Sequence, residues 1–293
     1  MKKILFISNP VAGKLGSRKA MFDVIEEFCK KGFEVSVAIT QHRGHATELA
    51  KTSKERGFDY VVCAGGDGTV KESICGLMLQ NNPLPLGYIP CGSTNDFANT
   101  LGLSLIPSHA AAAITKEKTI SMDVGSFNET NFAYVASFGA FTAISYSVPQ
   151  DLKNAIGYPA YLIEALKDIA NIKPYKMSLK TDDTEYDGEF IFGCVSNATC
   201  VAGVILHPNN VDICDGLFEV LLVRKPENPL DFNKIIGGVM SRDYSSDIFI
   251  YTKTKEICFD MNKAIPWSLD GEKQEGTKHV EIKNLNAALQ LFK

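Results

Sequence analysis

The sequence lacks the features that mark secreted, zinc-binding and membrane-spanning proteins. Its eight cysteines form no C-x-x-C pair and show no zinc-ligand spacing. Several lie in apolar runs such as VVCAGG and FIFGCVSNATC, which indicates free, buried thiols in a reducing compartment. No window approaches the roughly 18 apolar residues of a spanning helix, and the apolar stretch after Met1 is too short for a signal peptide. We therefore expect a soluble, cytoplasmic protein.

The chain also has no strong excess of charge of either sign. Its net charge of −4 argues against a protein that binds nucleic acid or another polyanion over its whole surface. The first 56 residues nevertheless contain 11 Lys and Arg against 6 Asp and Glu. This basic section favours phosphate groups or an anionic membrane surface, with an ordinary solvated face as the alternative. The five histidines show no metal-ligand pattern, and we interpret His42 and His45 beside Arg43 as a solvated loop rather than a phosphate clamp.

Strands and helices alternate over the first third of the chain. With 293 residues, 45% of them hydrophobic, the sequence is long enough for one large or two medium domains. Strand–helix alternation with short links predicts a doubly wound parallel sheet with helices on both faces. Strands are expected at 3–8, 33–40, 59–66 and 85–92, and helices at 16–32, 45–57, 69–80 and from about residue 93.

The pattern changes after about residue 122. Short β-like runs separated by turn residues follow one another, interrupted by one helical stretch at about 157–170. Such runs are typical of an antiparallel β-sandwich or barrel. We therefore predict an α/β domain at 1–122 and a β-rich domain at 123–279. The last residues, about 280–293, have no clear pattern and are expected to pack back on the first domain.

A glycine-rich link, GGDGT at 65–69, joins a predicted strand to a predicted helix. Glycines let the backbone turn sharply and let a phosphate come close, and the N–H groups that open a helix bind anions. The link matches neither the P-loop G-x-x-x-x-G-K-[ST] nor the dinucleotide pattern G-x-G-x-x-G. Because Asp67 would repel a phosphate, a divalent cation is expected between them. A tight turn needed only for packing is the alternative.

Two further segments have the composition of phosphate-binding loops. NPVAGK (9–14) ends the first strand with turn residues and a lysine, and PCGSTNDFA (90–98) ends the fourth strand with hydroxyl groups and a helix start. The carboxyl ends of parallel strands meet at one edge of a sheet, where such sheets bind ligands. Three loops of this kind at one edge are difficult to explain by packing alone.

Together these segments resemble the diacylglycerol/sphingosine lipid kinase catalytic family, in particular its soluble bacterial members. The resemblance rests on N-P-x-A-G-K, G-G-D-G-T and P-x-G-[ST]-x-N-D-F-A in this order. It continues through MDVG (122–125), FAYVASFGAF (132–141), DICDGLFEV (212–220) and LDGE (269–272), so it covers essentially the whole chain. NAD kinases and phosphofructokinases resemble the chain at GGDGT but lack the 90–98 loop. The resemblance implies a nucleotide domain of the NAD kinase/phosphofructokinase type followed by a β domain.

The resemblance implies Mg²⁺-dependent transfer of the γ-phosphoryl group of ATP to a lipid hydroxyl. Diacylglycerol is the acceptor that we expect before other lipids. It further implies that Asp67 and Asp123 organise a catalytic magnesium–water network and that Glu272 is the general base. If the strand there is regular, its period of two places Asp270 on the same face as Glu272, and a carboxylate can accept a hydroxyl proton. A solvated turn is the alternative for these two residues. The expected nucleotide-binding residues are Asn9, Lys14, Thr40, Gly65, Gly66, Asp67, Gly68, Thr69, Ser93, Thr94 and Asn95.

A second, structural magnesium is implied by the resemblance of DICDG to the family's turn at this place. Asp215 would supply a carboxylate, with backbone oxygens of Asp212 and Leu217 beside it, and hard oxygen ligands suit magnesium. A plain Asp-Gly turn is the alternative. The expected partners are ATP and a lipid met peripherally at the inner face of the membrane, and the sequence leaves a homodimer open.

The chain departs from the family pattern at three places, of which Ser93 keeps the hydroxyl group while Lys71 and the stretch 202–210 leave a loss of activity open. Lys71-Glu72 stands where many members have Asn-Glu, Ser93 stands where threonine is usual, and the stretch 202–210 has fewer glycines than usual. A phosphotransferase resembling NAD kinase, with a soluble acceptor, is one alternative. A nucleotide- or lipid-binding protein without turnover is the other.

Overall fold

The computed structural model describes residues 1–12, 16–93, 95–139, 173–201, 204–205, 207 and 211–293. The chain divides into two compact units. The first contains Met1–Val124, Asn131–Ala133 and Leu285–Lys293, and the second contains Gly125–Thr130 and Tyr134–Asn284. No helix among the described residues is long and apolar enough to cross a membrane.

The first unit is built on a parallel sheet. Strand β1 (Lys3–Ser8) pairs in parallel with β2 (Glu34–Ile39) on one side and with β3 (Tyr60–Gly65) on the other. Next to β3 lies β4 (Leu86–Pro90), and the end of β17 (His279–Phe292) pairs with β4 through Leu291 and Leu86. The last residues of the chain are thus the fifth parallel strand of this sheet.

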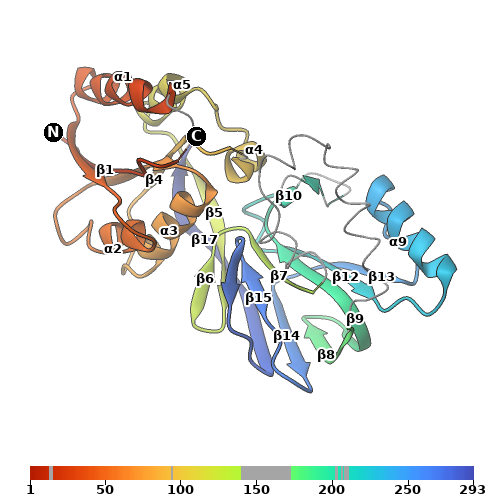
Figure 1. Cartoon of the computed structure of the whole chain (residues 1–293). Helices are drawn as coiled ribbons and strands as arrows, with labels where there is room; N and C mark the ends of the chain where they lie inside the picture. Colours follow the sequence, from red (N-terminus) through yellow and green to blue (C-terminus); the bar gives the residue numbers. More distant parts are fainter. Residues whose placement is uncertain (13–15, 94, 140–172, 202–203, 206, 208–210) are drawn as a thin grey trace. The chain divides into compact units, whose positions relative to one another are not determined.

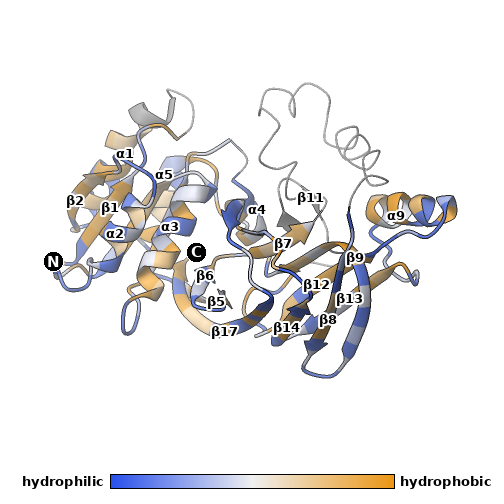
Figure 2. Ribbon diagram, turned by 60° about the horizontal axis from the view of Figure 1, so that its bottom comes forward, coloured by the Kyte–Doolittle hydropathy of each residue, from blue (hydrophilic) through white to orange (hydrophobic). Residues whose placement is uncertain are grey.

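Helices cover both faces of this sheet, as Figure 1 shows for α1 and α5 on one side and α2 and α3 on the other. The core under α1 and α5 is apolar because Phe6 and Val62 of the sheet meet Phe28 of α1, all three fully buried. Figure 2 shows β1 as a hydrophobic strand between these layers. The helices are α1 (Gly16–Lys30), α2 (His45–Lys51), α3 (Asp67–Met78), α4 (Asp96–Leu101) and α5 (Pro107–Ile114).

The second unit is built from antiparallel strands. Strand β9 pairs with β7, β8 and β12, β12 pairs also with β13, and β15 joins β7 to β16. The strands that follow α5 are β5 (Thr119–Phe127), β6 (Thr130–Phe132), β7 (Val135–Gly139), β8 (Tyr175–Thr181), β9 (Glu185–Ser196), β10 (Cys200–Val201), β11 (Val204–Ile205), β12 (Phe218–Arg224), β13 (Phe249–Thr254), β14 (Glu256–Met261), β15 (Trp267–Leu269) and β16 (Glu272–Gln274). One helix, α9 (Pro229–Ser241), lies between β12 and β13.

Aromatic rings form the centre of the second unit's core. Trp267, the chain's one tryptophan, is 1% exposed. Its ring lies 4.8 Å from that of Phe138 and 5.1 Å from those of Phe127 and Phe259, in edge-to-face arrangements that stabilise aromatic clusters. Trp267 lies two residues before the LDGE segment and in the same strand as its Leu269, so this core holds the backbone on one side of the segment.

The structure confirms the α/β-plus-β fold class and adds elements that the sequence pattern did not predict. These elements are helix α5, which has only eight residues, and helix α9. Helix α9 begins at an Asn-Pro pair, where Asn228 caps the helix by accepting hydrogen bonds from the N–H groups of Leu230 and Asp231. The helix expected at 157–170 lies outside the described residues. Seven cysteines of the described part are free, as expected, but Cys29 and Cys214 are exposed rather than buried.

Candidate functional site

Three loops leave the parallel sheet of the first unit at the same edge. The N–H of Asn9, after β1, donates to the Ala64 carbonyl of β3 over 3.0 Å, and the N–H of Cys91, after β4, donates to the Gly65 carbonyl over 2.8 Å. The N–H of Thr40, after β2, donates to the Ser8 carbonyl. Backbone bonds therefore hold the first residues of the loops side by side.

The loop after β4 touches the loop after β3 through glycines. A Cβ atom added at Gly92 would lie 2.7 Å from Cα of Gly66, and one added at Gly66 would lie 3.3 Å from Cα of Gly92. Only glycine allows backbones to approach this closely. Helix α3 begins directly after Gly66 and has no side-chain cap at that end. A bare helix start beside two glycine loops is suited to binding an anion.

Two asparagines fix the loops with their side chains. Asn9 donates from Nδ2 to Oγ1 of Thr69 over 3.0 Å and accepts from the N–H of Val11 at Oδ1. Asn95, in the left-handed region with φ of 51°, accepts the N–H of Gly92 at 2.8 Å and donates to the Gly92 carbonyl at 2.9 Å. Both asparagines thus order the loops from within.

The Asp67 carboxylate binds backbone rather than pointing freely at a ligand. It accepts the N–H groups of Asp96 (3.2 Å) and Phe97 (3.0 Å), the first residues of α4. Helix N-termini favour such carboxylates, because their first N–H groups have no partner within the helix. A carboxylate in this glycine loop therefore has a structural explanation of its own. Coordination of a metal by Asp67 stays a prediction.

Glu72, on α3, holds the loop that follows β2. Its carboxylate accepts the N–H of Gly44 at 2.8 Å and the N–H of Ala46 at 3.2 Å, and its carbonyl accepts the hydroxyl of Thr47. Glu72 thus ties α3 to the start of α2. The sequence interpretation did not assign it a role, because nothing within its own segment shows that its partners lie about 28 residues earlier in the chain.

These loops enclose a cavity of about 590 Å³. Burial raises the pKa of the neighbouring Cys91 thiol to about 11, so this thiol is neutral near pH 7 and is not a nucleophile there. Arg43 and His42 line the cavity and are both exposed, which agrees with the solvated loop expected from the sequence. The lining residues are Asn9, Pro10, Val11, Ala12, Thr40, Gln41, His42, Arg43, Gly66, Gly68, Thr69, Glu72, Gly92 and Ser93.

Asp270 and Glu272 belong to the second unit and do not lie on one regular strand, so the condition for placing them on one face is not met. Asp270 and Gly271 have φ angles of 49° and 82°, and Leu269 pairs with Glu272 across the turn. LDGE is therefore a two-residue hairpin turn, the conformation that Asp-Gly favours. The Asp270 carboxylate is buried and accepts the N–H groups of Tyr134 and Val135 at 3.0 and 2.9 Å. Glu272 opens β16 and is partly exposed.

Asp123 belongs to the first unit and is fully buried. Its carboxylate accepts the N–H of Ala287 at 2.7 Å. Ala287 has a φ of 51°, so this bond supports a strained point of β17. A catalytic role for Asp123 stays a prediction.

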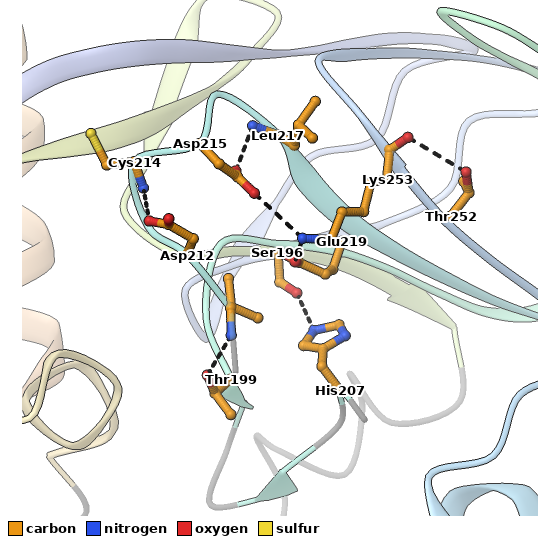
Figure 3. A network of polar contacts seen from close by, with 11 residues as sticks. Ser196, Thr199, His207, Asp212, Cys214, Asp215, Leu217, Glu219, Thr252 and Lys253 are labelled. Atoms are coloured by element: carbon orange, nitrogen blue, oxygen red, sulfur yellow. Dashed lines mark hydrogen bonds and ion pairs between the residues drawn. The ribbon is translucent and has the colours of Figure 1, made fainter. Parts of the chain in front are cut away.

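The DICDG segment of the second unit forms a turn held by its own carboxylates (Figure 3). Asp212 accepts the N–H of Cys214 at 3.1 Å, and Asp215 accepts the N–H of Leu217 at 2.9 Å. Lys253 approaches the other oxygen of Asp215 to 3.4 Å and pairs with Glu219 at 2.8 Å. The three predicted metal ligands, Asp212, Asp215 and Leu217, thus lie in one turn, beside a lysine that the sequence did not indicate.

Comparison with known proteins places the chain in a family. Residues 3–127 match the model of the diacylglycerol kinase catalytic domain. A diacylglycerol kinase of Bacillus subtilis (strain 168) is 30% identical over 277 residues, which are 93% of this chain and 90% of the relative. The chain belongs to the diacylglycerol kinase family. Membership makes it a transferase of the lipid kinase class.

Other members of the diacylglycerol kinase family are similar along nearly the whole chain. A diacylglycerol kinase of Staphylococcus epidermidis (strain ATCC 35984) is 28% identical over 292 residues, which are 99% of this chain and 92% of the relative. A crystal structure of a diacylglycerol kinase from Bacillus anthracis str. Sterne matches the fold with a TM-score of 0.78 at 23% identity, covering 99% of this chain and 96% of that one. This last likeness concerns the fold alone.

Most residues expected to bind a nucleotide in this diacylglycerol kinase family member fall in one place. Asn9, Thr40, Gly66, Gly68, Thr69 and Ser93 line the cavity, and Gly65, Asp67 and Asn95 hold the loops around it. Lys14 and Thr94 lie outside the described residues. The close approach of Gly66 and Gly92 and the open start of α3 fit a bound phosphate group, and the oxygen atoms of the Asp212–Leu217 turn fit a hard cation.

Proposed function

We propose that this protein is an ATP- and Mg²⁺-dependent lipid kinase that phosphorylates diacylglycerol to give phosphatidic acid. The observation that carries the proposal is the cavity of the first unit, where two glycine loops touch at the open start of α3. Glycine backbones and a helix N-terminus stabilise the charges of transferring phosphoryl groups without reorganising. Among relatives named diacylglycerol kinases, this cradle is best explained as the nucleotide site.

In this proposal the first unit binds and orients ATP. The phosphates lie against Gly66, Gly68 and the N–H groups that open α3, and hydroxyl groups of Thr69 and Ser93 donate hydrogen bonds to them. Thr40 also lines the cavity. Positioning of the phosphoryl group accounts for most of the catalysis of phosphoryl transfer. We accordingly assign residues 1–122, with the C-terminal strand, to nucleotide binding.

Residues 123–279, in this proposal, bind the lipid and supply the base. Glu272 accepts the proton of the lipid's primary hydroxyl as that oxygen bonds to the γ-phosphorus of ATP, while the bond from the γ-phosphorus to the bridging oxygen breaks and ADP leaves. Asp270 positions Glu272, since its bonds to the N–H groups of Tyr134 and Val135 fix the hairpin that carries the base. A buried carboxylate with two such donors is not free to move.

Magnesium ions complete the proposal. When bound with ATP, magnesium neutralises charge on the phosphates, and we assign Asp67 and Asp123 to the network around it. Asp212, Asp215 and Leu217 would hold a second, structural ion. Because diacylglycerol resides in a bilayer, we further propose peripheral association with the inner face of the membrane.

The proposal is tested by incubating the purified full-length chain with radiolabelled ATP, Mg²⁺ and single acceptors in mixed micelles. The acceptors are diacylglycerol, monoacylglycerol, a sphingoid base, phosphatidylglycerol and, as soluble competitors, NAD and a sugar. Label in phosphatidic acid is the expected result. Label in NAD or the sugar would favour the soluble-acceptor alternative. ATP binding without transfer to any acceptor would indicate a protein without turnover.

A further inference from the structure

Three polar side chains stand abreast on neighbouring strands of the second unit. Ser196 of β9 is the register partner of Glu219 on β12, and Glu219 is the register partner of Lys253 on β13. Register partners in an antiparallel pair face the same side of the sheet. The strand pairing itself therefore brings a carboxylate and an ammonium together, as Figure 3 shows.

Glu219 needs a cation at this place. The residue is 2% exposed, and burying an ionised carboxylate without a partner is costly. Lys253 Nζ lies 2.8 Å from its Oε1, while its Oε2 is buried and has no partner among the described residues. Lys253 is thus the charged group that compensates Glu219.

Lys253 has a second carboxylate partner at the edge of the sheet. Its Nζ lies 3.4 Å from Oδ2 of Asp215, and Oδ1 of Asp215 accepts the N–H of Leu217. The Lys253 side chain is 44% exposed, so its ammonium can move away from Asp215 without crossing a packed core. The two distances show that Glu219 is its nearer partner.

We propose that Lys253 is the resident cation of the Asp212–Leu217 turn and competes with a divalent ion for Asp215. This inference rests on the part of the proposed function that places a second magnesium in this turn. An arriving ion takes Oδ2 of Asp215, and Lys253 keeps its charge paired by retaining Glu219. Asp212, Asp215 and Glu219 together exceed the single ammonium in charge, so the turn still attracts a cation. Lys253 sets how tightly that cation is held.

The test uses Mn²⁺ as the probe and the full-length chain without nucleotide or lipid. Mn²⁺ affinity is measured by calorimetry and by the loss of the free-ion paramagnetic resonance signal. Lys253→Gln should bind Mn²⁺ about tenfold more tightly than the unaltered protein, a change of about 1.4 kcal/mol, because the variant removes one positive charge that repels the ion. Lys255→Gln, a change at an exposed lysine two residues away, should leave the affinity unchanged.

Two further variants test whether Mn²⁺ binds at Asp215 and whether the unpaired charge of Glu219 causes the change in affinity. Asp215→Asn should abolish the Mn²⁺ site in both the unaltered and the Lys253→Gln background. Because Lys253→Gln leaves Glu219 unpaired, the double variant Glu219→Gln/Lys253→Gln provides a version in which the buried pair is neutral. It too should bind Mn²⁺ more tightly than Glu219→Gln alone.

Equal Mn²⁺ affinity with and without Lys253 would overturn the inference, as would the absence of any binding that depends on Asp215. Neither result would bear on phosphoryl transfer, because the measurement contains no ATP and no acceptor. Conversely, a protein that fails the lipid assay can still show the tenfold change. The two proposals therefore fail separately.

Discussion

Glu72 determines how one wall of the cavity is held. Its carboxylate accepts two N–H groups at the start of α2, and its own backbone lies in α3, next to the glycine loop. Hydrogen bonds between backbone N–H groups and a charged acceptor each contribute about 1.5–3 kcal/mol. One side chain thus connects the Thr40–Arg43 wall to the start of the helix where we place the phosphates.

Replacing Glu72 by alanine should raise KM for ATP several-fold and lower the free energy of unfolding by about 2 kcal/mol or more, because two N–H groups lose their acceptor. Glu72→Gln keeps one acceptor oxygen and should have a smaller effect on both quantities. Steady-state kinetics and denaturant unfolding measure the two effects. Glu55→Gln, at an exposed site, is the control. An unchanged KM for ATP in Glu72→Ala would show that this wall does not contact the nucleotide.

His207 predicts a pH dependence of stability. Burial, with a smaller contribution from Lys253, lowers the pKa of His207 from 6.5 to about 4, and its Nε2 lies 2.8 Å from the Ser196 hydroxyl. The unfolded chain binds a proton near pH 6.5 and the folded chain does not. Stability should therefore be complete above pH 6.5 and fall as the pH drops from 6.5 to 4, by on the order of 3 kcal/mol.

Denaturant unfolding at several pH values checks this prediction against His207→Gln, which cannot titrate. The variant should lose the His207 part of the slope between pH 6.5 and 4, whatever its stability at neutral pH. Parallel curves for the two proteins would show that His207 titrates normally.

Among the elements, strand β9 packs closely against its neighbours at a position where glycine has no side chain. A Cβ added at Gly193 would lie 2.5 Å from Cζ of Phe138 and 2.8 Å from Cδ2 of Leu222, inside the aromatic core. Gly237, on the outer side of α9, has nothing within 4 Å of such an atom. The same substitution therefore has opposite consequences in the two elements.

Gly193→Ala should lower the free energy of unfolding by about 1–3 kcal/mol through overpacking, whereas Gly237→Ala should raise it by about 0.5–1 kcal/mol, because alanine favours a helix. Emission of Trp267, which is buried against Phe138, reports the transition in both variants. Equal stability of the two proteins would contradict the packing described for β9.

Much of the first unit could be predicted from the sequence, because alternating apolar strands and amphipathic helices carry a strong local signal. The loops that line the cavity could also be located, because each of these segments rich in glycine or turn residues follows a strand. Phosphate binding by them stays a prediction. The partners of Asp67, Glu72 and Lys253 could not, since each lies 25 or more residues away in the sequence and only the folded chain brings them together. The Asp-Gly pair at 270–271 is typical of a hairpin turn, and the shared face expected for Asp270 and Glu272 held only on the condition of a regular strand.

In the whole molecule, the two units have different proposed roles. We assign nucleotide binding to the glycine loops of the first and proton removal to Glu272 in the second. This division predicts that binding and turnover can be separated by mutation. A change at the base should leave the nucleotide site intact, because Glu272 belongs to a different unit from every residue that lines the cavity.

The most direct measurement compares Glu272→Gln with the unaltered protein, using one preparation of each for phosphatidic acid formation and for ATP binding. We predict that the rate falls by about 10²–10⁴-fold, the usual contribution of a general base, while the affinity for ATP stays within about twofold. Glu275→Gln, a change at an exposed glutamate shortly after Glu272 in the sequence, should behave like the unaltered protein. Equal rates of phosphatidic acid formation in Glu272→Gln and the unaltered protein would contradict the account.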